Sequence, residues 1–261
     1  KASGVLDEET LRMTTRLLHW HPDFYTVWNY RRQILLHLFE ASEEGKQPIC
    51  TSELRLVEEL VRKQPKSYWI WNHRRWILET MPQADWKREL GLTGVMLDLD
   101  NRNFHGWQYR HEVVRRLRMA DPAQEQQLIQ RELAYTKQKI SQSFSNGSAW
   151  HYRGKLLPLV LQATHDSDMQ MALIKEEFDM VQSAFYTDPE DQSAWIHYRW
   201  WIQYLEEQPA LPGLHGMELL RREAGVIREL LALEPEAKCM CGHGGLLLHM
   251  HACTALMACF Q

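Results

Sequence analysis

The sequence predicts an all-α protein, a curved solenoid of repeated helical hairpins. Three observations support this prediction. A tryptophan-centred motif recurs along the chain, helical spacing of apolar residues flanks each copy, and no segment shows the period-two alternation of a half-buried strand. A single helical hairpin cannot bury its apolar face alone, so the repeated hairpins are expected to stack side by side.

The motif is centred on a tryptophan and an arginine. The tryptophan recurs at intervals of 43, 36, 43 and 45 residues, as Trp28, Trp71, Trp107, Trp150 and Trp195. The arginine follows three residues later in four copies and four residues later in the fifth, as Arg31, Arg74, Arg110, Arg153 and Arg199. Because residues three apart share a helical face, the indole is predicted to fill the gap between hairpins. The guanidinium is predicted to reach an aromatic ring, a carboxylate or a helix-end carbonyl of the next unit.

Each copy of the motif is predicted to be the second helix of a pair. The five copies begin at Pro22, Pro65, Asn101, Phe144 and Pro189, with polar caps expected at Asp23, Ser67, Asn103 and Asp191. First helices are expected at 7–21, 51–64, 85–100, 123–143 and 173–188, with a sixth at 216–235. Short polar segments at 41–50, 80–84, 163–168 and 206–216 are expected to connect the pairs.

The chain is predicted to divide at residue 238. Residues 1–238 form the hairpin-repeat domain, with five repeats and a partial sixth. Residues 239–261 form an atypical tail, expected to be disordered or to make a short apolar helix. This tail contains C-x-C-x-H at 239–243 and H-x-H-x-C at 249–253. These are not the usual spacings of structural zinc sites, so we predict no metal in this chain.

Composition narrows the class of protein. The net charge of −4 and pI near 6.4 argue against a nucleic-acid-binding protein. No apolar run approaches the roughly 20 residues that a membrane-spanning helix needs. The five cysteines form no framework spread along the chain, which favours reduced thiols and a cytoplasmic location.

Two residues depart from the repeat pattern at the start of a second helix. Lys66 stands where other copies have Asp23, Arg102, Ser145 and Glu190, and His105 also lacks an equivalent. A lysine there is usually solvated, and a histidine usually caps or packs. The alternative is a ligand site, because a helix N-terminus with a lysine beside it suits an anion such as a diphosphate.

With these residues in view, the chain resembles the α subunits of protein prenyltransferases. The resemblance rests on the Trp-x-x-Arg centres "WNYRR", "WNHRR", "WQYRH" and "WHYRG" and runs from about Val5 to Lys238. It implies a right-handed superhelical solenoid wrapped around a β subunit, which holds the zinc ion and the isoprenoid pocket. This chain itself is expected to bind no cofactor.

The resemblance also implies a reaction and a set of site residues. A cysteine thiolate of a protein substrate attacks C1 of an isoprenyl diphosphate, and diphosphate leaves. The family's "Pro-Lys-x-Tyr" stretch falls on Pro65 to Tyr68, and its nearby histidine motif falls on Asn103 to Trp107. Lys66 and Tyr68 are therefore expected to be catalytic, and Lys66, Tyr68 and His105 to bind geranylgeranyl diphosphate at the subunit interface.

The residue after Tyr68 separates the members of the family. The α subunit shared by farnesyltransferase and type I geranylgeranyltransferase carries a glutamine there, which helps to anchor the carboxylate of a CaaX peptide. This chain has Trp69, which favours the Rab type, in which an escort protein presents Rab GTPases. The alternatives left open are the shared α subunit and a non-catalytic helical-repeat scaffold.

Overall fold

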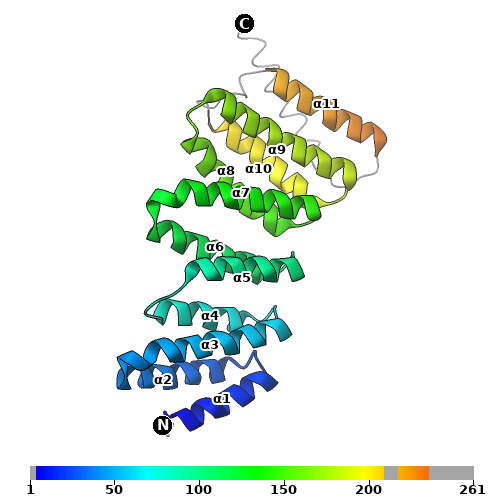
Figure 1. Cartoon of the computed structure of the whole chain (residues 1–261). Helices are drawn as coiled ribbons and strands as arrows, with labels where there is room; N and C mark the ends of the chain where they lie inside the picture. The colour runs from blue at the N-terminus through cyan, green and yellow to red at the C-terminus, as the bar shows by residue number, and fades with distance from the viewer. Residues whose placement is uncertain (1–3, 209–216, 235–261) are drawn as a thin grey trace. The chain divides into compact units, whose positions relative to one another are not determined.

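The computed structural model describes residues 4–208 and 217–234, and every regular element within them is a helix. The longer helices are α1 (Glu8–Trp20), α2 (Tyr25–Ala41), α3 (Glu43–Lys63), α4 (Tyr68–Thr80), α5 (Trp86–Leu99), α6 (Phe104–Ala120), α7 (Glu125–Gln142), α8 (Gly147–Ala163), α9 (Ser167–Thr187), α10 (Gln192–Glu206) and α11 (Met217–Leu233). A short 3₁₀ helix, η1 (Pro122–Gln124), precedes α7. The predicted all-α hairpin repeat, including the sixth first helix, is confirmed (Figure 1).

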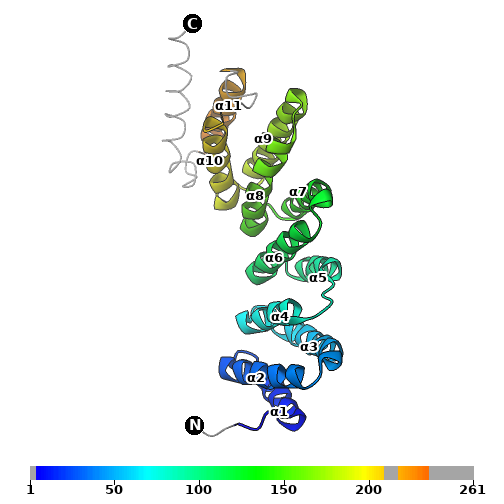
Figure 2. The same cartoon turned by 90° about the vertical axis from the view of Figure 1, so that its left-hand side faces the viewer.

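The chain forms two compact units, Lys1–Ala120 and Asp121–Gln261. In the first unit, α1 to α6 make three hairpins. The second helices α2, α4 and α6 pack in succession on one side, and α3 and α5 lie on the other (Figure 2). In the second unit, α7 pairs with α8 and α9 with α10, while α8 also packs on α10 and α11 on α9. Each unit is thus a stack of hairpins.

Two first helices begin earlier than predicted. α3 begins at Glu43, because Ser42 caps it by accepting a 3.0 Å hydrogen bond from the Gly45 N–H. α9 begins at Ser167, because Asp166 accepts hydrogen bonds from the next N–H groups along the chain. The polar residues interpreted as connecting segments at 41–50 and 163–168 therefore include helix caps and first turns.

The predicted caps of the second helices are half right. Asp191 accepts from the Ser193 N–H at 2.7 Å and Asn103 from the Gly106 N–H at 3.1 Å, so both are confirmed. Asp23 and Ser67 make no cap bond to α2 or α4. Instead, the Ser67 hydroxyl donates to Asp23 Oδ1 at 2.5 Å. This bond joins the loops of two adjacent repeats, which a search for local caps does not anticipate.

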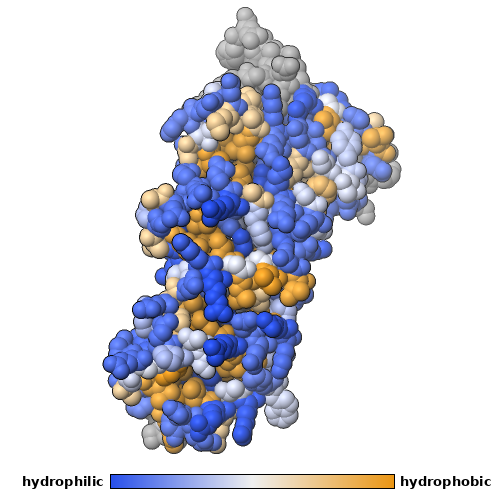
Figure 3. Space-filling view, viewed as in Figure 1, coloured by the Kyte–Doolittle hydropathy of each residue, from blue (hydrophilic) through white to orange (hydrophobic). Residues whose placement is uncertain are grey.

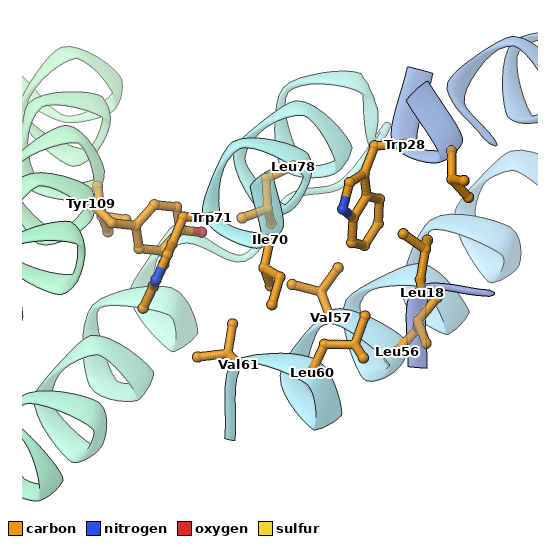
Figure 4. Close-up of a cluster of buried hydrophobic side chains, with 12 residues drawn as sticks. Leu18, Trp28, Leu56, Val57, Leu60, Val61, Ile70, Trp71, Leu78 and Tyr109 are labelled. Atoms are coloured by element: carbon orange, nitrogen blue, oxygen red, sulfur yellow. The ribbon is translucent and has the colours of Figure 1, made fainter. Parts of the chain in front are cut away.

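Trp28, Trp71 and Trp150 pack against the next hairpin, as predicted. In all five repeats the indole Nε1 donates to the carbonyl oxygen six residues earlier, on Pro22, Pro65, Asn101, Phe144 and Pro189. This bond fixes the indole against the loop that begins its own helix. Figure 4 shows Trp28 beside Leu18 and Leu56, and Trp71 against Tyr109 of the next repeat, with ring centroids 5.2 Å apart. These contacts belong to one apolar cluster that runs through the first unit.

Three of the motif arginines, Arg31, Arg74 and Arg153, bind buried glutamates, as predicted. Arg31 donates to both oxygens of Glu53 at 2.8 and 2.5 Å, and Arg74 to both oxygens of Glu89 at 2.8 and 2.6 Å. In each case the glutamate lies on the first helix of the next repeat and both side chains are buried. The same motif therefore supplies both an apolar contact and a buried ion pair between neighbouring repeats.

The fifth repeat departs from this scheme, and the prediction for Arg199 is wrong. Arg199 is exposed, and Tyr198, three residues after Trp195, takes the buried position. The carboxylate at the equivalent place on α11 is Glu223, which is 1% exposed. Gln182 donates to both its oxygens, at 2.8 and 3.0 Å, and Arg222 Nε lies 3.1 Å from one of them. The buried Glu223 therefore has no motif arginine bound to both of its oxygens. Gln182 and Arg222 donate to it instead.

The replacement of Glu223 by glutamine is expected to stabilise the chain at neutral pH. Burial raises the pKa of Glu223, and Gln182 and Arg222 oppose this rise only in part. A carboxyl whose pKa is higher in the folded state stabilises the fold below its unfolded pKa, and this contribution is lost as pH rises through the folded pKa. Glu223→Gln should therefore raise the free energy of unfolding by about 1 kcal/mol at pH 7 and by less at pH 4. Urea unfolding at both pH values measures this, and a lower stability than the parent at pH 7 would contradict it.

The predictions for the cysteines, the tail and the last connecting segment concern residues that the structure describes only in part. Cys50 is a buried free thiol, and the other four cysteines, the 239–261 tail and most of the 206–216 segment lie outside the described residues. Within residues 4–208 and 217–234, no helix is long and apolar enough to cross a membrane. The same residues contain no group of three or more His, Cys, Asp or Glu arranged to hold a metal ion. On the face shown in Figure 3, polar side chains predominate and apolar residues are exposed in separate patches.

Candidate functional site

Two of the three predicted site residues line one hollow in the first unit. This hollow, of about 200 Å³, lies between α4 and α6. Tyr68, the first residue of α4, and His105, the second residue of α6, bring their rings to a centroid distance of 6.3 Å in an edge-on arrangement. Tyr68 is 51% exposed, so its hydroxyl is accessible from solvent. The structure thus brings Tyr68 and His105 together at the N-terminal ends of neighbouring second helices.

Lys66 lies two residues before α4 and is exposed. The side chain of Ser67 does not cap α4, because its hydroxyl is turned to Asp23. The first-turn N–H groups of α4 therefore receive no cap from Ser67, and Lys66 adds a positive charge beside the positive end of the helix dipole. This arrangement favours an anion near Lys66 and Tyr68, although the role of Lys66, Tyr68 and His105 stays a prediction.

The electrostatics of the hollow also favour an anion. Glu112 lines it, but Arg115 binds both carboxylate oxygens at 2.6 and 2.8 Å, and Arg116 Nε binds one of them at 2.9 Å. These two guanidinium groups lower the pKa of Glu112 to about 2. Arg75 lines the same hollow and forms no ion pair with any residue that the structure describes. The charge of Glu112 is therefore balanced by two arginines, whereas Arg75 has no carboxylate partner among the described residues.

A second arginine, Arg32, contacts Asn72, which lines this hollow. Arg32 of α2 donates from Nη2 to Asn72 Oδ1 at 2.7 Å and from Nε to His73 Nδ1 at 3.3 Å. Burial, together with the charge of Arg75, lowers the pKa of Arg32. Burial also lowers the pKa of His73 to about 4 despite the nearby carboxylate of Glu53. His73 is therefore neutral at pH 7, with Nδ1 accepting from Arg32 and Nε2–H donating to Glu53 at 3.1 Å.

The site residues predicted from the sequence do not include Arg32, Asn72 or Arg75. The signal that could have found them is positional: Asn72 directly follows Trp71, and Arg32 and Arg75 each lie four residues after a motif tryptophan. One such residue in isolation looks like a solvated helix side chain. Only the packing of α2 beside α4 places Arg32 next to Asn72.

The second unit contains a larger hollow of different character. Its volume is about 470 Å³, and it lies between α8 and α10 with Gly147, Gly154 and Trp200 in its lining. A Cβ added to Gly154 would lie 3.3 Å from the Trp200 ring, so the glycine allows the ring to lie close to α8. None of the predicted site residues lines this hollow.

Comparison with known proteins identifies the repeat. Five segments match the protein prenyltransferase alpha subunit repeat, namely residues 7–38, 50–81, 86–117, 129–159 and 174–205. Each match covers one of the five hairpins, from the first helix of a pair into its second. The five segments together cover more than half of the chain.

Curated relatives share these repeats. The chain is 43% identical over 246 residues to a Schizosaccharomyces pombe protein named geranylgeranyl transferase type-2 subunit alpha, covering 90% of this chain and 71% of the relative. Rat and human proteins of the same name are 42% and 41% identical over 220 residues, covering 82% of this chain. The chain spans only 37% of the length of these mammalian relatives.

A solved structure shows the same fold. The match has a TM-score of 0.60 at 22% identity and covers 90% of this chain and 78% of the other. That structure is described as Candida albicans protein geranylgeranyltransferase-I complexed with GGPP. With the repeat match and the 43% identical relative, these findings show that the chain belongs to the protein prenyltransferase α-subunit family.

Proposed function

We propose that this chain is the α subunit of a heterodimeric Rab geranylgeranyltransferase, active only with its β subunit. The enzyme transfers a geranylgeranyl group from geranylgeranyl diphosphate to C-terminal cysteines of Rab GTPases in the cytoplasm, with a Rab escort protein presenting the substrate. The family implies a β-subunit partner, and relatives at 41–43% identity carry the type-2 name. We assign the catalytic zinc ion to the β subunit.

The observation that carries this proposal is that Lys66, Tyr68 and His105 lie at the N-terminal ends of α4 and α6. In the transfer, a sulfur–carbon bond forms at C1 of the isoprenoid, and the bond from C1 to the diphosphate oxygen breaks. Negative charge builds up on the leaving diphosphate, so cations and hydrogen-bond donors placed there lower the barrier. Lys66 supplies a charge, and Tyr68 and His105 supply donors from adjacent repeats.

The position after Tyr68 supports the Rab type over the CaaX-reading types. Trp69 packs its ring against Tyr25 of the preceding repeat, at 5.4 Å, and against Tyr68, at 5.1 Å. The Trp69 ring is thus engaged in aromatic packing, and the position lacks the glutamine amide that helps to anchor a CaaX carboxylate in the shared α subunit. An enzyme that relies on an escort protein does not need that anchor.

Lys66→Ala is expected to lower turnover while leaving assembly intact. A charge-assisted hydrogen bond contributes about 1.5–3 kcal/mol, so kcat should fall by roughly 10- to 100-fold. Lys66 is exposed, so the free energy of unfolding should change by less than about 0.5 kcal/mol. The measurement is transfer of labelled geranylgeranyl to a Rab protein by the chain co-expressed with a type-2 β subunit, with escort protein present.

Three outcomes separate the alternatives. A stable complex with β that transfers to Rab, and is impaired by Lys66→Ala, supports the proposal. A stable complex without transfer would favour the helical-repeat scaffold. Transfer to a CaaX peptide without escort protein would favour the α subunit shared by farnesyltransferase and geranylgeranyltransferase type I. Loss of pairing in the Lys66→Ala variant would instead show that Lys66 is structural.

A further inference from the structure

Arg32 belongs to the first repeat but makes its polar contacts with the second. Its guanidinium lies 5.2 Å from the centroid of the Trp76 ring, which holds it against α4. From there it reaches the Asn72 amide oxygen at 2.7 Å. Arg32 is half-buried and forms no ion pair with any residue in the described part of the chain. Its charge is therefore directed into a hydrogen-bond network.

The contact with Arg32 fixes the orientation of the Asn72 amide. A guanidinium has only donors, so the amide atom facing Arg32 must be the oxygen. The Asn72 NH₂ group then faces the other way, and it lies 3.4 Å from the Tyr68 hydroxyl oxygen. At that contact Asn72 donates and Tyr68 accepts.

The direction of this hydrogen bond determines what Tyr68 can do. A hydroxyl whose oxygen already accepts from Asn72 keeps its own proton for another acceptor. Among the described residues, no acceptor for the Tyr68 O–H is present, and Tyr68 lines the hollow between α4 and α6. The proton is thus available to an oxyanion bound there.

We propose that Arg32 is a positioning residue for the Tyr68 hydroxyl and acts on it through Asn72. This inference rests on the proposed function, in which Tyr68 donates to the leaving diphosphate. Arg32 orients Asn72, Asn72 donates to Tyr68, and Tyr68 presents its proton toward the substrate. The first repeat thereby contributes to a site formed by the second and third.

Among the residues that the structure describes, this arrangement is found at one junction, that of the first and second repeats. Arg75 occupies the place of Arg32 in the next repeat, and Gln108 that of Asn72, yet the structure gives no hydrogen bond between them. In the fifth repeat Arg199 holds the same place and is exposed. A contact required merely for stacking would recur, as the pairs Arg31–Glu53, Arg74–Glu89 and Arg153–Glu177 do at three junctions.

The sharpest test is the Asn72→Asp variant. The new carboxylate keeps the shape of the side chain and still accepts from Arg32, but it has no N–H to donate. The Tyr68 hydroxyl would then donate to this carboxylate rather than toward the hollow. Asn72→Asp and Arg32→Met are each expected to lower kcat by about 3- to 10-fold, the range of a single hydrogen bond, with little change in the KM for geranylgeranyl diphosphate.

The decisive comparison uses Tyr68→Phe. In the complex with β, Asn72→Asp and Arg32→Met should lose their effect on kcat when combined with Tyr68→Phe, because the hydroxyl on which they act is gone. Full losses that persist in the Tyr68→Phe background would overturn the inference. So would an Asn72→Asp variant with parental turnover, or a Tyr68→Phe variant with no defect.

Two controls separate this inference from general damage and from failure of the proposed function. Arg199→Met removes an exposed arginine from the equivalent place and should leave kcat unchanged. Urea unfolding of each variant detects a loss of fold, and Asn72→Asp leaves the bond from Arg32 to His73 in place. If the parent complex transfers nothing to Rab, the proposed function fails and this inference with it. If the parent transfers and the cycle is additive, only this inference fails.

Discussion

Replacing Arg153 with methionine is expected to lower the free energy of unfolding of the second unit by about 3–5 kcal/mol. Arg153 and its partner Glu177 are both fully buried. Arg153 Nε lies 2.8 Å from one carboxylate oxygen of Glu177, and Nη1 donates to the Leu133 carbonyl at 2.9 Å. Methionine fills much of the same volume but leaves a buried carboxylate without its cation. The loss reflects this uncompensated charge rather than lost packing.

The pH dependence of this loss identifies its cause. In the parent, burial raises the pKa of Glu177, but Arg153 and then His197 more than offset that effect, so the pKa is lowered overall. This lowered pKa contributes stability above the unfolded pKa, and the contribution is lost as pH falls through the folded value. Without Arg153 the pKa of Glu177 should rise, because burial then dominates. The difference between variant and parent should therefore be largest at neutral pH and shrink in acid.

A second variant tests the same argument from the other side. Arg153→Met combined with Glu177→Leu removes both charges and should recover most of the stability, since well-packed apolar residues can replace a buried ion pair. Arg199→Met serves as a matched control, because this arginine lies in the same unit and is exposed. Urea unfolding between pH 4 and 8 measures all three. A pH-independent loss that the double variant does not recover would show that Arg153 acts through packing alone.

The repeat network shows how far periodicity can predict this fold. Trp71 and Arg74 belong to a motif whose recurrence predicts packing between hairpins, and the structure confirms it. The glutamate partners Glu53, Glu89 and Glu177 were missed, although each precedes the tryptophan of its own repeat by the same 18 residues. A glutamate on a helix is usually solvated, so a single copy attracts no notice. The shared spacing was the available signal.

Other features depend on contacts that spacing does not encode. Arg199 was assigned to the motif by residue type, but a shift of one residue turns a side chain by about 100° around the helix. Tyr198, at the correct spacing, is the buried residue. The bond from Ser67 to Asp23 likewise joins loops 44 residues apart. Such pairings follow from how the hairpins stack, which the local pattern does not specify.

The residues of the candidate site also divide into those that the sequence indicates and those that only the packing of the helices reveals. Lys66 and His105 stand out in the sequence as departures from the repeat, and Tyr68 comes from the resemblance to a family motif. The structure places Tyr68 and His105 at one hollow. Arg32 and Asn72 carry no such motif and lie 40 residues apart. Their pairing became visible only when α2 and α4 were seen to pack together.

Trp71→Ala is expected to destabilise the first unit by about 3–5 kcal/mol. The Trp71 indole is 5% exposed and packs against Tyr109 of the next repeat, with ring centroids 5.2 Å apart. Its Nε1 donates to the Pro65 carbonyl at 2.7 Å. Alanine would remove the ring contact, leave a cavity inside the apolar cluster and leave the Pro65 carbonyl without this donor. Each of these effects weakens the contact between the second and third hairpins.

Two further variants separate the contributions of the indole N–H and of burial to this loss of stability. Trp71→Phe keeps an aromatic ring and removes the indole N–H, so it should cost about 1–3 kcal/mol, through one lost hydrogen bond and a smaller buried ring. The Pro65 carbonyl keeps a donor in this variant, because Asn103 Nδ2 also binds it at 3.0 Å. Trp20→Ala removes the same type of side chain from a site that is 89% exposed, and should change stability by less than about 0.5 kcal/mol. Urea unfolding followed by circular dichroism compares all three. If Trp71→Ala were as mild as Trp20→Ala, neighbouring hairpins would not depend on the motif tryptophan, and its regular recurrence would need another explanation. A large loss confined to Trp71 would show that the contact between the second and third hairpins depends on this residue, which is the role that its recurrence predicts.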